Sequence, residues 1–232
     1  MHAVPRSAVT LPAAACLAVL ALAACGTPLL PDQQQTRTYT VPLVRVLVVD
    51  GHAGHVNVTG SDRSGVSVTE RISYTGQPPS TTHRESGGTL TVSYTCPSEV
   101  DCGVDYDIQV PRGLEVRAST QAGAIRLSSV AGQVKASTEA GSITGDSLAG
   151  DSAELSTHIG SIDAAFVSVP AMIRATTTTG TITIRVPVTG SRYAVITATG
   201  IGRTSVHVPK DSSAPHVIIA RTDVGSVSIG PA

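Results

Sequence analysis

Histidine side chains that could bind a metal are few, and two of them lie together. His52 and His55 are three residues apart and close to Asp50, and two imidazoles with a carboxylate could hold a transition metal. Glycines flank both histidines, so the stretch also fits a hairpin turn at a solvated edge, which is the interpretation we favour. His158 takes a turn position that other repeats fill with Gln, Glu or Thr, so we expect it at the surface.

Acidic residues are densest between Glu99 and Asp107. Asp101, Asp105 and Asp107 are the candidates for a hard cation such as Ca²⁺, and the last two share one face of a strand. The Gly- and Asp-rich nonapeptides of calcium-binding β-rolls are absent from the sequence. We therefore favour a solvated strand face, and we predict neither a metal site nor a cofactor.

Nucleophilic and acid–base catalysis find little support in the sequence. No Gly-x-Ser-x-Gly motif occurs, and the many threonines recur at equivalent positions, so none stands out as a nucleophile. Glycoside chemistry would need acidic residues gathered along one face. One equivalent outward position instead carries a mixed set of side chains: Arg117, Lys135, Glu154, Arg174 and Ala194. We predict a non-enzymatic protein, with a polysaccharide-active enzyme as the least favoured alternative.

The charge balance and the aromatic content argue against a nucleic-acid partner. The chain has 16 Lys and Arg against 17 Asp and Glu, only 3% aromatic residues and no Trp. A nucleic-acid groove needs a basic stripe, and usually aromatic side chains on which bases stack. The sequence predicts that neither is present.

The first 24 residues resemble the signal peptide of a bacterial lipoprotein. Arg6 precedes an apolar run over residues 11–22, which is short for a membrane span and ends in the string LAACG around Cys25. In such a lipobox the peptidase cuts before the Cys, whose thiol carries a diacylglyceryl group. We expect Cys25 to anchor the protein to the extracytoplasmic face of the cell membrane through acyl chains, and residues 25–41 to form a flexible tether. An ordinary secretory signal with a chance Cys is the alternative.

The remaining cysteines predict one disulfide bond. Cys16 lies in the signal peptide and Cys25 in the lipobox, which leaves Cys96 and Cys102. An even remainder, close in sequence and in an oxidising compartment, favours pairing of these two residues. A metal-binding pair is the alternative, but no further Cys or His lies nearby at zinc-like spacing.

Short runs of alternating or β-branched residues between Gly, Pro, Asp and Ser predict an all-β protein. We expect residues 42–113 to form an antiparallel β region that contains the disulfide loop, with an exposed loop near residues 77–88. We expect residues 114–232 to form a second region, built from repeats.

The repeat region is defined by a Thr-x-x-Gly phrase that returns every 18 to 25 residues. An apolar residue lies two positions before each Thr, and in five of the six units another lies two positions after the Gly. Alternate residues of a strand share one face, so these positions form an interior, while Thr and Gly suit a tight turn. The phrase occurs at these pairs: Thr120 and Gly123, Thr138 and Gly141, Thr157 and Gly160, Thr177 and Gly180, Thr197 and Gly200, Thr222 and Gly225.

Such self-similarity at a nearly fixed period is typical of stacked repeats. We predict a β-solenoid-like stack of two-strand units in which the threonines form a structural ladder at the turns. A meander of hairpins would give similar spacing and is the alternative topology. The irregular segment near residues 210–215 departs from the period and predicts a capping turn.

The units A-S-T-x-x-G-x-I and the lead-in DYDIQVPRGLEVRAST resemble the DUF4097 family, which is also called the toast-rack or adhesin family. The resemblance covers roughly residues 44–229. It implies a fold of repeated β-strands and an adhesin-like role, and it brings no catalytic residues with it.

Taken with the predicted anchor, these features favour a non-enzymatic surface lipoprotein that acts as an adhesin-like or scaffold module. Its partner would be an envelope protein or polymer, bound by shape and by hydrogen bonds along exposed Ser and Thr rows. The alternative is an accessory or sensing module in the cell-envelope stress response. The strand edges at the ends of a coil stack are unpaired and could pair with another copy of the chain, so a homo-oligomer is compatible with the sequence.

Overall fold

A computed structural model describes residues 33–97 and 101–232, which belong to one compact unit. Over these residues the chain forms 19 β-strands and no helix, and so contains no helix that could cross a membrane. The predicted signal peptide, Cys25 and the first part of the predicted tether lie outside the described residues.

The strands before the repeats are β1 to β7. Their bounds are Gln33–Pro42 for β1, Val46–Asp50 for β2, Val56–Ser61 for β3, Gly65–Tyr74 for β4, Ser80–Ser86 for β5, Thr89–Thr95 for β6 and Cys102–Pro111 for β7.

The repeat strands are β8 to β19. Their bounds are Glu115–Ala122 for β8, Ile125–Ser128 for β9, Val134–Ala140 for β10, Ile143–Leu148 for β11, Ser152–Ile159 for β12, Ile162–Phe166 for β13, Met172–Thr179 for β14, Ile182–Val186 for β15, Tyr193–Ile201 for β16, Thr204–Val206 for β17, His216–Val224 for β18 and Val227–Pro231 for β19.

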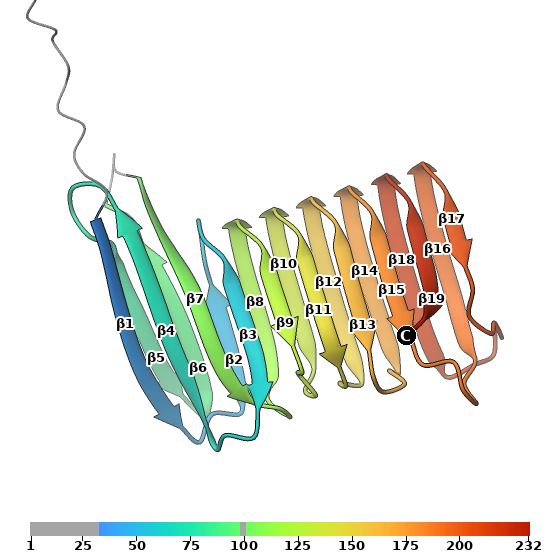
Figure 1. Cartoon of the computed structure of the whole chain (residues 1–232), viewed down its shortest axis with the longest axis horizontal. Coiled ribbons are helices and arrows are strands. Elements are labelled where there is room, and N and C mark those ends of the chain that lie inside the picture. The colour runs from blue at the N-terminus through green and yellow to red at the C-terminus, as the bar shows by residue number, and fades with distance from the viewer. Residues whose placement is uncertain (1–32, 98–100) are drawn as a thin grey trace, which may run out of the picture. The chain divides into compact units, whose positions relative to one another are not determined.

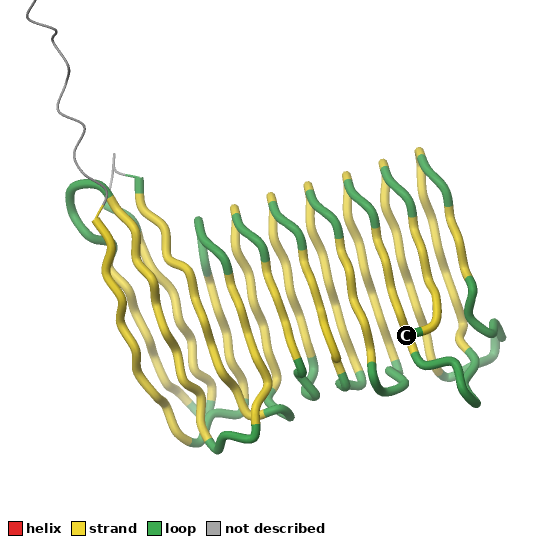
Figure 2. Tube along the Cα trace, viewed as in Figure 1, coloured by secondary structure: helices red, strands yellow, loops and turns green. Residues whose placement is uncertain are grey.

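The strands form two facing sheets that extend side by side along the long axis of the unit (Figure 1). Sheet A has ten strands in the order β1-β4-β7-β3-β9-β11-β13-β15-β19-β17, and sheet B has nine in the order β16-β18-β14-β12-β10-β8-β2-β6-β5. In the repeat region each coil contributes one strand to each sheet, and strands of successive coils pair in parallel (Figure 2). The all-β stack of two-strand repeats is confirmed.

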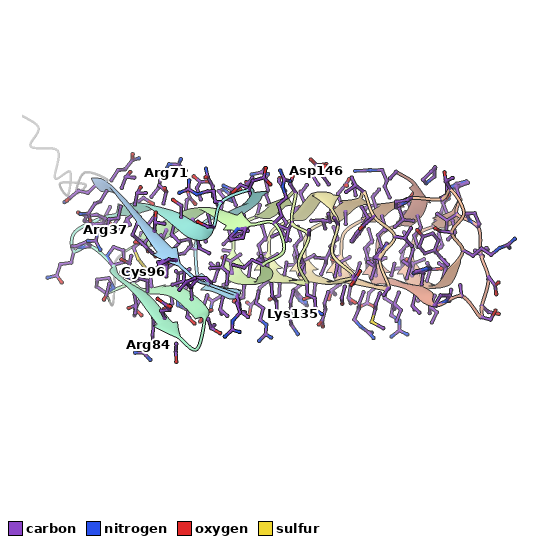
Figure 3. The ribbon with its side chains drawn as sticks, turned by 90° about the horizontal axis from the view of Figure 1, so that it is seen from below. Arg37, Arg71, Arg84, Cys96, Lys135 and Asp146 are labelled. Carbon is purple, nitrogen blue, oxygen red and sulfur yellow. A yellow bond between two sulfur atoms is a disulfide. The ribbon has the colours of Figure 1, made fainter. Side chains whose placement is uncertain are left out.

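The core is the thin layer between the two sheets. Along β10 the burial alternates, with Val134, Ala136 and Thr138 buried and Lys135 exposed, as expected for a strand with one face on the core. Alanine occupies one inward position in most of the coils, with Leu155 in the third, and its small side chain lets the sheets approach closely. Viewed along the sheets, side chains fill this layer, while Lys135 and Asp146 project outward on opposite sides (Figure 3).

Residues 42–113 form a mixed region, so the expectation of purely antiparallel pairing was wrong. β4 is antiparallel to β1 and β7, and β5 is antiparallel to β6. However, β2 pairs in parallel with β6 and β8, and β3 pairs in parallel with β7 and β9. β2 and β3 thus act as one more coil of the stack, because their inward Val and Leu residues continue the same core.

The coils do not stack in the order of the sequence. β18 lies between β14 and β16, and β19 lies between β15 and β17, so the last unit of the chain is inserted beneath the fifth. The segment near residues 210–215 therefore connects the outermost coil back to an inner one. It covers the outermost strand β16 at Tyr193, so the expected capping turn lies on the fifth unit and not on the last one. The inward Ile218 and Ala220 of β18 are fully buried, whereas the inward Val195 and Thr197 of β16 are only half-buried.

The end of the stack that carries β1 is closed by contacts between the two sheets. The Arg37 guanidinium donates a hydrogen bond to the Thr81 hydroxyl, and the rings of Tyr39 and His83 stack with centroids 4.3 Å apart. Residues 33–41 thus belong to β1 and not to a tether, and residues 80–86, most of the expected loop at 77–88, form β5. Both strands are largely exposed, so they lack the apolar alternation by which a strand is recognised in a sequence.

Glycine is required at the turn of each coil by close backbone packing. Gly160 has a φ of +151°, and a Cβ there would lie 1.9 Å from the carbonyl oxygen of Gly141 in the neighbouring coil. No side chain fits at that distance, so the recurring glycines follow from the stacking itself.

Candidate binding surface

The ladder threonines point into the turns and are buried. Thr120 is in register with Thr138, Thr138 with Thr157, Thr157 with Thr177 and Thr177 with Thr222. The hydroxyls of Thr138, Thr157 and Thr177 donate to the carbonyls of Gly123, Gly141 and Gly160 in the preceding coil, at 3.1, 2.9 and 2.9 Å. Because these hydroxyls hold turns together, they are not available to a ligand.

The residue predicted for the fifth unit of the threonine ladder, Thr197, was wrong. Thr199, and not Thr197, is in register with Thr222 and donates to the Gly225 carbonyl at 2.8 Å. Gly202, with a φ of +149°, takes the turn position that was expected for Gly200. The stretch TATG contains two threonines at the same parity, and the sequence could not show which of them meets the turn.

The exposed surface with the most regular chemistry is the outer side of β8, β10 and β12 in sheet B, which we call the coil face. Side chains in the same register form three rows across it. The first row is Arg117, Lys135 and Glu154; the second is Ser119, Ser137 and Ser156; the third is Gln121, Glu139 and His158.

Charged groups of the coil face are largely neutralised by their neighbours. Lys135 Nζ lies 3.1 Å from Glu154 Oε2, and the Arg117 guanidinium lies 2.7 Å from Glu115 Oε1. The Ser119 hydroxyl donates to the Val49 carbonyl at 3.2 Å. Among the described residues, no side-chain hydrogen bond engages the hydroxyls of Ser137 and Ser156, which are half-buried in the middle of the face.

A shallow groove crosses the coil face. It has a volume of about 570 Å³ and is lined by residues of β2, β8, β10 and β12, including Arg117, Ser119, Lys135, Ser137 and Glu154. Its donors and acceptors lie on rigid parallel strands, which are about 4.8 Å apart. Such a surface presents rows of hydrogen-bonding groups at a constant spacing.

The outward stripe changes character towards β16. Arg174 is in register with Ile219 and then with Ile196, so the expected position of Ala194 in the stripe was wrong. Ala194 lies one row away, in register with Val217 and Met172. Because Thr199 and not Thr197 meets the turn, this strand lies two residues later than expected, and the row that continues from Arg174 becomes apolar at Ile219 and Ile196.

The histidines that could have formed a metal site have separate roles. His55 Nδ1 accepts a hydrogen bond from the Ala124 N–H at 3.0 Å, and the His52 ring meets the Tyr94 ring edge-on. Asp50 Oδ1 lies 3.3 Å from the Ser119 hydroxyl oxygen and is an alternative acceptor to the Val49 carbonyl for its one hydrogen. His158 Nδ1 is 3.1 Å from the Thr178 hydroxyl on the next coil.

The acidic candidates are likewise placed beside donors. Asp105 Oδ1 accepts from the His55 backbone N–H at 2.7 Å. Asp107 accepts from Asn57 Nδ2 at 2.8 Å and forms an ion pair with Arg71. Asp101 accepts through its backbone carbonyl from the Thr75 N–H. In the described ranges, no three His, Cys, Asp or Glu side chains gather as metal ligands would.

Cys96 and Cys102 form the predicted disulfide, with their Cα atoms 5.9 Å apart. The bond links the end of β6 in sheet B to the start of β7 in sheet A. It therefore ties the two sheets together beside the end of the stack that β1 and β5 close.

The interior near β1 holds a buried carboxylate that the sequence did not reveal. Glu70 is 1% exposed and accepts a hydrogen bond from the Tyr39 hydroxyl at 2.9 Å, and it faces Tyr106 across the β4–β7 pair. Burial, with the Glu70 charge as a second cause, raises the pKa of Tyr39 and of Tyr106 well above the ordinary value. The sequence signal that could have revealed this buried carboxylate is a Glu at a position where the alternation of β4 places an inward side chain.

Comparison with solved structures supports the fold. A putative cell adhesion protein from Clostridium sporogenes superposes with a TM-score of 0.51 at 10% identity, over 86% of this chain and 100% of that one. A putative adhesin from Bacteroides fragilis matches at a TM-score of 0.46 and 15% identity, over 86% of this chain and 97% of that one. No protein-family model matches the sequence, and no curated protein matches it. At 10% identity the superposition on the Clostridium sporogenes protein shows a shared fold and does not extend to function.

Proposed function

We propose that the protein is a lipid-anchored, non-enzymatic, adhesin-like module that binds a hydroxyl-rich polymer of the cell envelope along its coil face. The observation that carries this proposal is the row of Ser119, Ser137 and Ser156, which stand in register on three parallel strands. A polysaccharide also presents hydroxyls at a regular repeat, so several weak hydrogen bonds can form together on a rigid surface. The putative cell adhesion protein of the same fold is consistent with this role.

The same proposal places the chain in the toast-rack, or DUF4097, fold family. The repeated A-S-T-x-x-G-x-I units support this placement, as do their positions on parallel strands and turns of the stack. No residue role is carried over from the family.

Binding of an envelope polysaccharide to the purified protein tests the coil face directly. We expect the double variant Ser137→Ala with Ser156→Ala to weaken binding by about tenfold, since two hydrogen bonds of roughly 0.5–1.5 kcal/mol each are lost. Ser228→Ala on the outer side of sheet A is the matched control and should leave affinity unchanged. Equal affinity for all three proteins would rule out the coil face as the site.

Anchoring has its own test. In cells fed an alkyne analogue of palmitate, the wild-type chain should incorporate label and sediment with membranes, because Cys25 carries the lipid. Cys25→Ser should abolish both, whereas Cys16→Ser should change neither. Label that persists in Cys25→Ser would refute the proposed anchor.

A further inference from the structure

The end of the stack opposite β1 presents strand edges with no neighbour. Within the part of the chain that the structure describes, β16 pairs only with β18, and β17 pairs only with β19. An unpaired edge is a row of backbone donors and acceptors ready to accept another strand. Both sheets end at this coil, which lies at the far end of the stack from β1 (Figure 1).

The hydrogen bonds of Tyr193 show which residues of β16 face the open side. Its N–H donates to the Pro209 carbonyl and its C=O accepts from the Asp211 N–H, both on the side away from β18. In a strand, the N–H and C=O of alternate residues point to the same side. The backbone groups of Val195, Thr197 and Thr199 therefore point outward along the free edge, beyond the short cover at Tyr193.

Beyond the cover at Tyr193, β16 lacks the charged residues and prolines that protect many edge strands. Its sequence, YAVITATGI, contains no charged residue and no proline over nine residues. At the opposite end, β1 includes Arg37 and Pro42, and β5 includes Arg84 and Glu85. Those two edges also contact each other through Arg37 and Thr81. The edges of β1 and β5 carry charged residues and contact each other, whereas the edge of β16 is uncharged and open beyond Tyr193.

The outer surface beside the first half of this edge is apolar, whereas the exposed Arg221 of β18 is in register with Ala198 further along. Met172 is 43% exposed and Ile196 is 49% exposed, and they lie on β14 and β16 with the half-buried Val217 and Ile219 of β18 between them. Ile201, at the end of β16, is 71% exposed. The apolar surface thus continues up to the unpaired edge instead of ending before it.

We infer that the β16 edge pairs with the same edge of a second copy of this chain, in antiparallel orientation over residues 195–199. A two-fold axis between identical edges brings each outward N–H opposite a C=O, so the contact is self-complementary. Neither edge carries a charge, so two copies do not repel each other. The segment at residues 209–211 lies one strand beyond Tyr193 and sets the limit of the pairing at that end.

This pairing gives a closed dimer with both sheets aligned end to end. Residues 1–32 precede β1, so they join the stack at its closed end, far from β16. In the dimer the two chain segments that carry Cys25 therefore leave from opposite ends. If these segments are anchored, a consequence that rests on the proposed function, the dimer can join two membranes.

Sedimentation equilibrium of the full-length chain carrying Cys25→Ser, in mild detergent, tests the dimer without a lipid anchor. We expect the mass of a dimer in a concentration-dependent equilibrium. Ala198→Lys places like charges across the paired edges and should weaken association by about tenfold or more. Thr176→Lys, which adds the same charge on the outer side of the internal strand β14, should leave association unchanged.

Amide hydrogen exchange of the unmodified edge gives a second readout that needs no variant. The N–H groups of Val195, Thr197 and Thr199 should become protected as protein concentration rises, while those of β14 keep constant protection. A monomer at every concentration overturns the proposal. Open-ended polymers, or equal dissociation by Ala198→Lys and Thr176→Lys, also overturn it, because a two-fold edge contact closes on itself.

Discussion

The hydroxyl of Thr157 donates a hydrogen bond to the carbonyl of Gly141 in the neighbouring coil, at 2.9 Å. Thr157 is buried, so Thr157→Val keeps the shape and removes only this bond. We expect the free energy of unfolding to fall by about 0.5–1.5 kcal/mol, measured by chemical denaturation. Thr197→Val is the control, because Thr197 lies off the ladder and should change stability by less. Equal losses for both variants would contradict the role of the ladder.

The turn glycines should tolerate no side chain. In Gly160→Ala the new Cβ would lie 1.9 Å from the Gly141 carbonyl oxygen, at a φ that L-residues avoid. We expect a loss of at least about 2–4 kcal/mol in unfolding free energy, read from thermal or urea denaturation. Gly113→Ala, where a Cβ meets nothing within 4 Å, should be nearly neutral. A stable Gly160→Ala protein would mean that the coils can separate at little cost.

The buried Glu70 depends on Tyr39. Tyr39→Phe keeps the ring that stacks on His83 but removes the donor, and a buried carboxylate without its partner is costly. We expect a loss of about 1–3 kcal/mol in unfolding free energy. In a Glu70→Gln background the same substitution should lower the free energy of unfolding clearly less, since the group that loses its donor is then a neutral amide. A double-mutant cycle with no coupling between the two positions would be inconsistent with this contact.

The protein should lose stability in alkali through its tyrosines. Burial is the first cause that raises the pKa of Tyr39, Tyr94, Tyr106 and Tyr193 above the ordinary value. Below about pH 10 these phenols are protonated in both states, so their contribution to stability is constant. Above that pH the unfolded chain releases protons that the folded chain retains, and stability falls.

Absorbance at 295 nm, which follows tyrosinate, checks this prediction. The signal of the four tyrosines should rise together with the loss of far-ultraviolet β-sheet signal, above the pH of free tyrosine. Titration of all tyrosines near pH 10 in a protein that remains folded would contradict their burial.

The sequence alone determined the features that depend on local chemistry. A coil needs a small or hydroxyl side chain and a glycine at its turn, and apolar residues at alternate positions before and after it. The phrase around Thr138 and Gly141 shows all of these within ten residues, and the pair Cys96 and Cys102 was just as local. Each of these features follows from backbone geometry within one unit.

The tertiary structure decided which strands are neighbours. Backbone hydrogen bonds join any two strands whose edges meet, whatever their side chains, so the sequence did not show that β18 lies between β14 and β16. For the same reason the largely polar β1 and β5 escaped prediction, although they close one end of the stack. The open edge of β16 follows from that order, because a strand becomes an edge only when the rest of the chain has been placed.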